Sequence, residues 1–321
     1  MNIKGGESRL NRKPHIQSLS EFKRGISKDL ICTNDQVQHN VRSDTGLINT
    51  LSPLKNGNNS SVSISSRNNI LNFAHPVDAA IIKTLDNPAI NTIFNKIVQT
   101  GIDATWGLSL ATGIHVGPNT YPELYKIVIE CADKLGIPIP YVVISDQIKG
   151  INACTAGTNQ FSFIAISSML PLIMNIEELK FIIGHECGHL ALGHVVYHTA
   201  INMVGSVSEL LPDRAGLICC EDIEIAAKSL LKLEAGLLNI DEIDIDTYVN
   251  ESNTVLQNTM LGKLGEITMS HPIIPKRIKA LQLFSNSIVY IKALGIKSEA
   301  SNSLLTEERL SAETEKIIEI M

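Results

Sequence analysis

The sequence has few aromatic residues and no excess of positive charge. Phe, Trp and Tyr make up 4% of its 321 residues, and its formal net charge is −6 at pH 7. Proteins that bind nucleic acids usually present a basic surface and aromatic rings on which bases stack. The composition therefore argues against a nucleic-acid partner.

Long apolar runs are also missing. A membrane-spanning helix needs about 18 or more apolar residues with few interruptions, and none is present. The most apolar region, residues 181–211, is interrupted by polar side chains: His185, Glu186, His189, His194, His198 and Glu209. We therefore expect no transmembrane segment.

The cysteines and the first residues indicate a compartment. Residues 1–30 lack the apolar core of a secretory signal peptide. The six cysteines do not have the spacing of a small disulfide-rich domain: Cys32, Cys131, Cys154, Cys187, Cys219 and Cys220. These absences favour reduced thiols and a cytoplasmic location.

Composition divides the chain into three parts. Residues 1–72 form a polar stretch with one aromatic ring, which predicts a disordered basic tail because it cannot bury enough apolar surface to offset its ordering entropy. Residues 73–290 have the apolar content of a folded domain. Residues 291–321 end in an acidic segment that predicts an amphipathic helix or a frayed tail.

The folded part reads as a mostly helical α+β domain. Helices are expected at 121–135, where Thr120 and Glu123 suggest a capping box, and at about 223–233, 241–264 and 275–284. Two short runs rich in branched residues, 141–145 and 161–167, are separated by turn-forming residues and predict a small antiparallel sheet.

One further helix carries the chemistry. Asn175 is a favourable N-cap with Glu178 three residues later, so a helix should run from Ile176 to about His198. Inside it lies His185-Glu186-Cys187-Gly188-His189, a His-Glu-x-x-His pattern. Positions i and i+4 share one helix face, so both imidazoles can bind one zinc ion, and Glu186 can reach a zinc-bound water as general base.

A third ligand must come from elsewhere. His194 does not fit the spacing of a metzincin, and with His198 it is better explained by hydrogen bonds at the end of the helix. Glu209 is the better candidate, with Asp213 one turn later to accept the outer N–H of a bound imidazole. The alternative is that Glu209 and Asp213 are a solvated pair at a helix start. Pro212 between them requires a helix that begins near Ser208 or later.

Several stretches in fixed order resemble the gluzincin zinc metallopeptidases related to the membrane protease HtpX and the CAAX prenyl endopeptidase. The similarity covers roughly residues 75–285. It rests on Gly184–His194, on Ser208–Leu217, on Val116-Gly-Pro with Tyr121–Tyr125 and Leu135–Pro138, on Asn152–Gly157, and on Ser270-His-Pro with Arg277.

The resemblance implies a zincin-type domain with one zinc ion, held by His185, His189 and Glu209, with Asp213 behind them and Glu186 as general base. It also implies a protein or peptide substrate that pairs with an edge strand at about 161–166. Asn152, Ala153, Phe161 and Phe163 would then contact the substrate. His271 would donate a hydrogen bond in the transition state, although a His before Pro can equally cap a helix, and Arg277 can equally be a structural ion-pair partner.

The chain departs from the best-known relatives because no membrane helices accompany the active helix, so it is most similar to the soluble bacterial members. The sequence predicts a zinc endopeptidase. Two alternatives remain: a narrowly specific processing peptidase of one partner, and a chaperone-like binding protein whose zinc is structural. An intact Glu186 argues against the second alternative, because a structural site needs no base.

Overall fold

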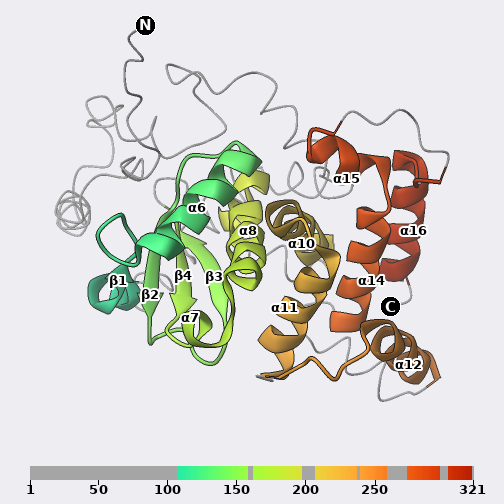
Figure 1. Cartoon of the computed structure of the whole chain (residues 1–321), viewed down its shortest axis with the longest axis horizontal. Coiled ribbons are helices and arrows are strands. Elements are labelled where there is room, and N and C mark those ends of the chain that lie inside the picture. The colour runs from blue at the N-terminus through green and yellow to red at the C-terminus, as the bar shows by residue number, and fades with distance from the viewer. Residues whose placement is uncertain are drawn as a thin grey trace, which may run out of the picture.

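The computed structural model describes residues 107–157, 162–196, 207–236, 239–258, 273–296 and 303–319. The expected tail at 1–72 lies outside these ranges, as do Phe161, His198 and His271. Within them, helices predominate around one four-stranded sheet (Figure 1). The prediction of a mostly helical α+β domain with a small sheet is confirmed. None of the described helices combines the length and the apolarity that a membrane crossing requires.

The elements follow one another in this order: β1 (Ile114–His115), α6 (Pro122–Leu135), β2 (Tyr141–Ser145), β3 (Ala153–Gly157), β4 (Ser162–Ser167), α7 (Leu170–Ile173), α8 (Ile176–Leu192), the 3-10 turn η2 (His194–Val196), α10 (Val207–Cys220), α11 (Ile223–Ala235), α12 (Ile245–Asn258), α14 (Ile274–Ser285), α15 (Ile288–Ala293) and α16 (Glu307–Glu319). Figure 1 shows α8 and α10 between the sheet and the group of α14 and α16.

The expected antiparallel sheet is wrong, because the sheet is mixed. Its order is β1-β2-β4-β3, and β2 and β4 are parallel. The segment between the two predicted strands is not only a turn: residues 153–157 form β3, which pairs antiparallel with β4. The chain thus leaves β2, forms the outer strand and comes back, so β4 runs in the same direction as β2.

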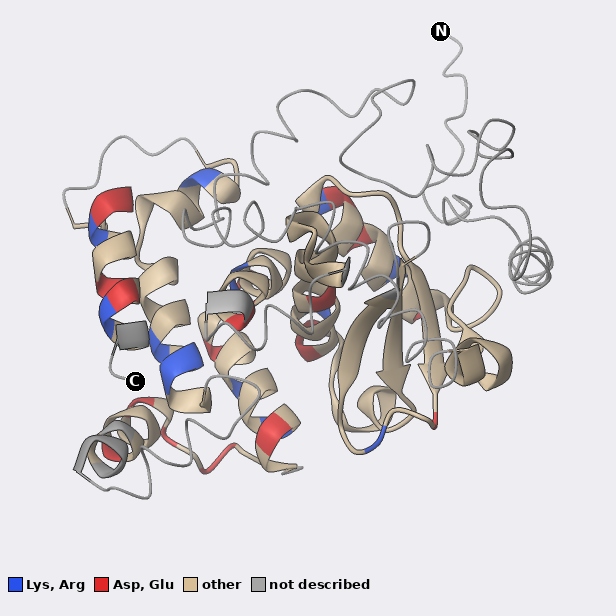
Figure 2. Cartoon of the chain, turned by 180° about the vertical axis from the view of Figure 1, so that it is seen from behind, with Lys and Arg blue, Asp and Glu red and all other residues tan. Residues whose placement is uncertain are grey.

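Alternation along the strands gives the sheet two buried faces. Val142, Ile144, Ile164 and Ile166 belong to the main core with α6, α8 and α10. Tyr141, Val143, Phe163 and Ala165 form a smaller cluster on the other face. The strands contain no Lys, Arg, Asp or Glu, and in Figure 2 the charged residues lie on helices and connections. The sheet thus has no charged side chains and is covered by apolar residues on both faces.

The boundaries of three helices differ from the expectation. The capping box of Asn175 and Glu178 is present at the start of α8, but the helix ends at Leu192, because Gly193 adopts the left-handed conformation (φ 75°) that terminates helices. Helix α6 begins at Pro122 without a cap from Thr120, because Tyr121 is the N-cap residue and has φ 58° with no side-chain cap bond. Helix α10 begins at Val207, one residue before the start that Pro212 was expected to require.

Glycines bring α8 and α10 into unusually close contact. A Cβ atom on Gly188 would lie 2.7 Å from Ala215 Cβ and 2.9 Å from Pro212 Cα, and one on Gly184 would lie 2.6 Å from Cys219 Cβ. On the facing helix, a Cβ on Gly216 would lie 2.7 Å from the carbonyl oxygen of Phe181. No other residue fits these positions unless the two helices separate.

Replacing Gly188 with Ala should therefore lower the free energy of unfolding by about 1–3 kcal/mol through overpacking. Gly107→Ala is the matched control, because a Cβ there meets nothing within 4 Å. The control should change the stability by less than about 1 kcal/mol. Urea denaturation of both variants measures the difference, and equal stabilities would show that the close contact is not needed.

Candidate metal centre and active site

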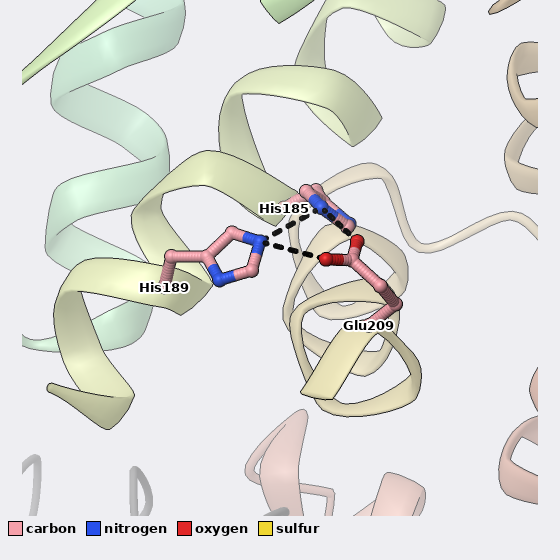
Figure 3. A group of neighbouring side chains, drawn as sticks. All are labelled: His185, His189 and Glu209. Atoms are coloured by element: carbon pink, nitrogen blue, oxygen red, sulfur yellow. Dashed lines mark hydrogen bonds and ion pairs between the residues drawn. The ribbon is translucent and has the colours of Figure 1, made fainter. Parts of the chain in front are cut away.

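Three buried side chains meet where α8 and α10 cross. His185 and His189 lie one turn apart on α8, and Glu209 lies in the first turn of α10 (Figure 3). One ligand atom from each lies within 4.8 Å of the others. The exposed fractions are 8%, 2% and 3%, so all three side chains are buried. Among the described residues, this is the one such group of His, Cys, Asp and Glu.

The spacing of these atoms fits a zinc ion. The two Nε2 atoms are 3.2 Å apart, and Glu209 Oε2 is 3.4 Å from His185 Nε2. Glu209 Oε1 is 3.9 Å from His189 Nε2. Ligand atoms about 2.0–2.1 Å from a tetrahedral zinc ion are roughly 3.3–3.4 Å from one another. Two imidazole nitrogens and a carboxylate are also the donors that zinc prefers.

The outer nitrogens of both imidazoles have buried partners. His185 Nδ1 is 2.9 Å from Asp213 Oδ1, so its N–H donates to the carboxylate and Nε2 is left with a lone pair facing the centre. His189 Nδ1 is 3.1 Å from Nδ1 of His194. For His189 Nε2 to act as a ligand, the proton between these two rings belongs to His189. His194 was expected within the last turns of the helix, but it follows the helix end, and its ring supports a candidate ligand.

Arg277 anchors the carboxylate behind His185. Its Nε donates to Asp213 Oδ2 at 2.8 Å and its second terminal nitrogen donates to Oδ1 at 2.6 Å, both buried. Burial alone would raise the pKa of Asp213, but the Arg277 guanidinium lowers it below its usual value. Arg277 is therefore an ion-pair partner of Asp213, and this pair joins α14 to the site.

Charge at the centre favours a cation. Glu186, Glu209 and Asp213 are buried, and Arg277 is the guanidinium beside them. Three buried carboxyl groups thus lie near one guanidinium, and this excess of acidic groups favours a divalent cation. In the protein without metal, burial would lower the pKa of His185, but Asp213 and Glu209 raise it to about 10. The surroundings of this imidazole therefore stabilise positive charge.

Glu186 lies on α8 beside the cluster and lines the same cavity. Burial raises the pKa of its carboxyl group. Thr155 on β3 contacts it: Oγ1 is 2.7 Å from Glu186 Oε2 and 3.0 Å from the Glu186 carbonyl oxygen. The side chain that the sequence suggested as general base is thus placed at the cavity and held from the strand.

The cavity has a volume of about 490 Å³ and contains the whole cluster. Its lining includes the segment from Lys149 to Cys154 and the end of α11, with Leu230, Leu233 and Glu234. Asn152 and Ala153 are among the residues that line this cavity.

The expected strand for substrate pairing is wrong. Strand β4 lies between β2 and β3, so both of its edges are already hydrogen-bonded. Phe163 is 1% exposed and packs in the cluster on the far face of the sheet, away from the cavity. The strand beside the cavity is β3, which has no strand on its outer side within the described ranges. Phe161 and His271 lie outside those ranges.

Two features were missed by sequence reasoning. The Thr155 contact joins residues 31 positions apart, and no periodic pattern predicts it. The glycines at 184, 188 and 216 did give a signal, since Gly at positions i and i+4 of a buried helix indicates a close partner helix.

A helix that carries His-Glu-x-x-His and packs against a second helix with a buried Glu defines a zincin-type metallopeptidase domain. Residues 118–211 match peptidase family M48. The central part of the chain is therefore similar to metallopeptidases of this family. The matched segment includes His185, Glu186, His189 and Glu209, and it ends before Asp213.

Similar proteins carry related names. A plastoglobule-localized metallopeptidase of Arabidopsis thaliana is 23% identical over 255 residues, which cover 68% of this chain and 73% of the relative. A protease HtpX homolog of Streptococcus pneumoniae is 34% identical over 110 residues, 34% of this chain. The chain spans about a third of that homolog, 36% of its length. No solved structure matches.

Asp213→Asn should weaken zinc binding about 10- to 100-fold, because the amide cannot hold the His185 tautomer as the carboxylate does. Asp222→Asn is the control: Asp222 caps α11 by accepting from two backbone N–H groups, and Asn caps equally well. Zinc titration against a competing chelator measures both variants, with circular dichroism confirming that they are folded. Unchanged affinity in Asp213→Asn would contradict the role assigned to this carboxylate.

Proposed function

We propose that the protein is a zinc-dependent endopeptidase that binds one zinc ion per chain through His185, His189 and Glu209. The observation that carries the proposal is the position of Glu186, a buried carboxylate on the wall of the cavity that also contains the three ligands. When bound, zinc supplies a Lewis acid that polarises the substrate carbonyl and lowers the pKa of a water to about 7. Glu186 accepts the proton of the attacking water and returns it to the leaving amine.

The number of protein ligands distinguishes this proposal from a structural zinc. Structural sites usually have four protein ligands and are closed, whereas catalytic sites have three and leave one position open. Here the cluster has three members and opens into a cavity. This supports a catalytic centre over a chaperone-like protein with a structural metal.

Strand β3 supports an extended peptide as the substrate. An edge strand presents backbone N–H and C=O groups to which an extended chain can add by β-pairing. Ala153 and Cys154 on this strand line the cavity with Asn152. A substrate strand on this edge would cross the cavity beside Glu186, so an internal bond could be cleaved. Backbone contacts of this kind do not depend on the substrate sequence, so they do not determine how selective the enzyme is. Cleavage of a single partner therefore remains the alternative.

Glu186→Gln should bind zinc as the wild type does and cleave an unfolded protein about 10²- to 10⁴-fold more slowly, because the amide accepts no proton. Glu209→Gln should lose both zinc and cleavage. Glu177→Gln is the control, since Glu177 lies on the same helix, forms a partly exposed ion pair with Lys180 and does not line the cavity. Zinc content and cleavage of labelled casein are measured for all four proteins.

Each result has a distinct meaning. Zinc bound by the wild type without cleavage of casein would favour the specific processing enzyme or the structural zinc. Equal cleavage by wild type and Glu186→Gln would remove Glu186 from the mechanism. No zinc in the wild type would refute the metal centre itself.

A further inference from the structure

The Thr155 hydroxyl is one buried polar group that the proposed mechanism does not use. Thr155 is 6% exposed and pairs with Ile164 in the sheet, so its side chain faces α8. Its Oγ1 lies 2.7 Å from Glu186 Oε2 and 3.0 Å from the carbonyl oxygen of the same residue. One hydroxyl therefore contacts both the side chain and the backbone of Glu186.

Hydroxyl chemistry explains why both contacts matter. A Thr hydroxyl has one hydrogen to donate and lone pairs with which to accept. It can donate to the Glu186 carboxylate, or it can turn its hydrogen to the carbonyl and accept from the carboxylic acid. In either orientation the hydroxyl remains in contact with Glu186.

The position of Thr155 differs from that of a catalytic group. The cavity is lined by Glu186 and by Asn152, Ala153 and Cys154, but Thr155 is not part of the lining. The hydroxyl thus contacts Glu186 without lining the cavity itself.

We infer that Thr155 is a positioning residue, whose hydroxyl fixes the Glu186 carboxylate relative to a substrate bound on the same strand. This inference rests on the proposed peptidase function. Residues 152–154 would align the substrate backbone, and the next residue along β3 would align the base. The same strand would therefore contribute to the position of the base and to that of the scissile bond. Misplacement of a catalytic group by about 1 Å can cost 10²-fold in rate.

The test compares Thr155→Val with Thr155→Ser in the full-length, zinc-loaded protein, using labelled casein as substrate. Val keeps the shape and the β-branch of Thr but has no hydroxyl, whereas Ser keeps the hydroxyl. Thr155→Val should lower kcat about 10- to 100-fold and change KM less than about twofold, because positioning of the base affects the chemical step. Thr155→Ser should restore most of kcat, and zinc content should be equal throughout.

Thr314→Val is the matched control. Thr314 is also buried, donates to the carbonyl oxygen of Leu310 at 2.7 Å and accepts from Arg214 at 3.2 Å, but it lies on α16. Losing that hydroxyl also removes one hydrogen bond to a carbonyl oxygen and one to a charged side chain, and it should reduce thermal stability without changing kcat. A merely structural role of Thr155 would give the same pattern as this control.

Two results would overturn the inference: wild-type kcat in Thr155→Val, or an equal loss of kcat in Thr155→Ser. If the wild type itself does not cleave casein, the failure belongs to the proposed function, and crystal structures then decide. Zinc-loaded wild type and Thr155→Val are compared, and the inference requires the Glu186 carboxylate to move in the variant. An unmoved carboxylate rejects it.

Discussion

Close packing of α8 against α10 is the constraint on which the candidate metal centre depends. His185 and His189 are on one helix and Glu209 is on the other, so the separation of the helix axes sets the separation of the ligand atoms. Glycines at 184, 188 and 216 permit that separation. With a side chain at any of these positions, the helices would move apart and the nitrogens and carboxylate would no longer fit one ion.

Burial of charge is the second requirement of the site. Carboxylates from Glu186, Glu209 and Asp213 are removed from water, which is costly unless they are paired. Arg277 from α14 compensates Asp213 with two hydrogen bonds, and Asp213 in turn orients His185. The remaining negative charge makes the centre receptive to a divalent cation. The ion pair between Asp213 and Arg277 thus joins α10 to α14 and also supports the candidate metal centre.

Local chemistry made much of the domain predictable. The capping box at Asn175 and the His-Glu-x-x-His pattern each span at most five residues. Such short patterns can be recognised in a sequence because the α-helix repeats every 3.6 residues. The sequence also predicted the candidate third ligand, because Glu209 lies only twenty residues after His189. The sheet was harder to predict from the sequence. Strand β3 lies in a segment of turn-forming residues, and it forms because β4 is available to pair with it, not because of its composition.

The sequence by itself determined the residue types of the centre and the helix that carries two of them. Only the tertiary structure decided that β3, and not β4, borders the cavity, that Arg277 is the partner of Asp213, and that Thr155 holds Glu186. The physical reason is range. Helix periodicity and capping act over a few residues, whereas these contacts join positions 31 and 64 residues apart and arise only when a common core is buried.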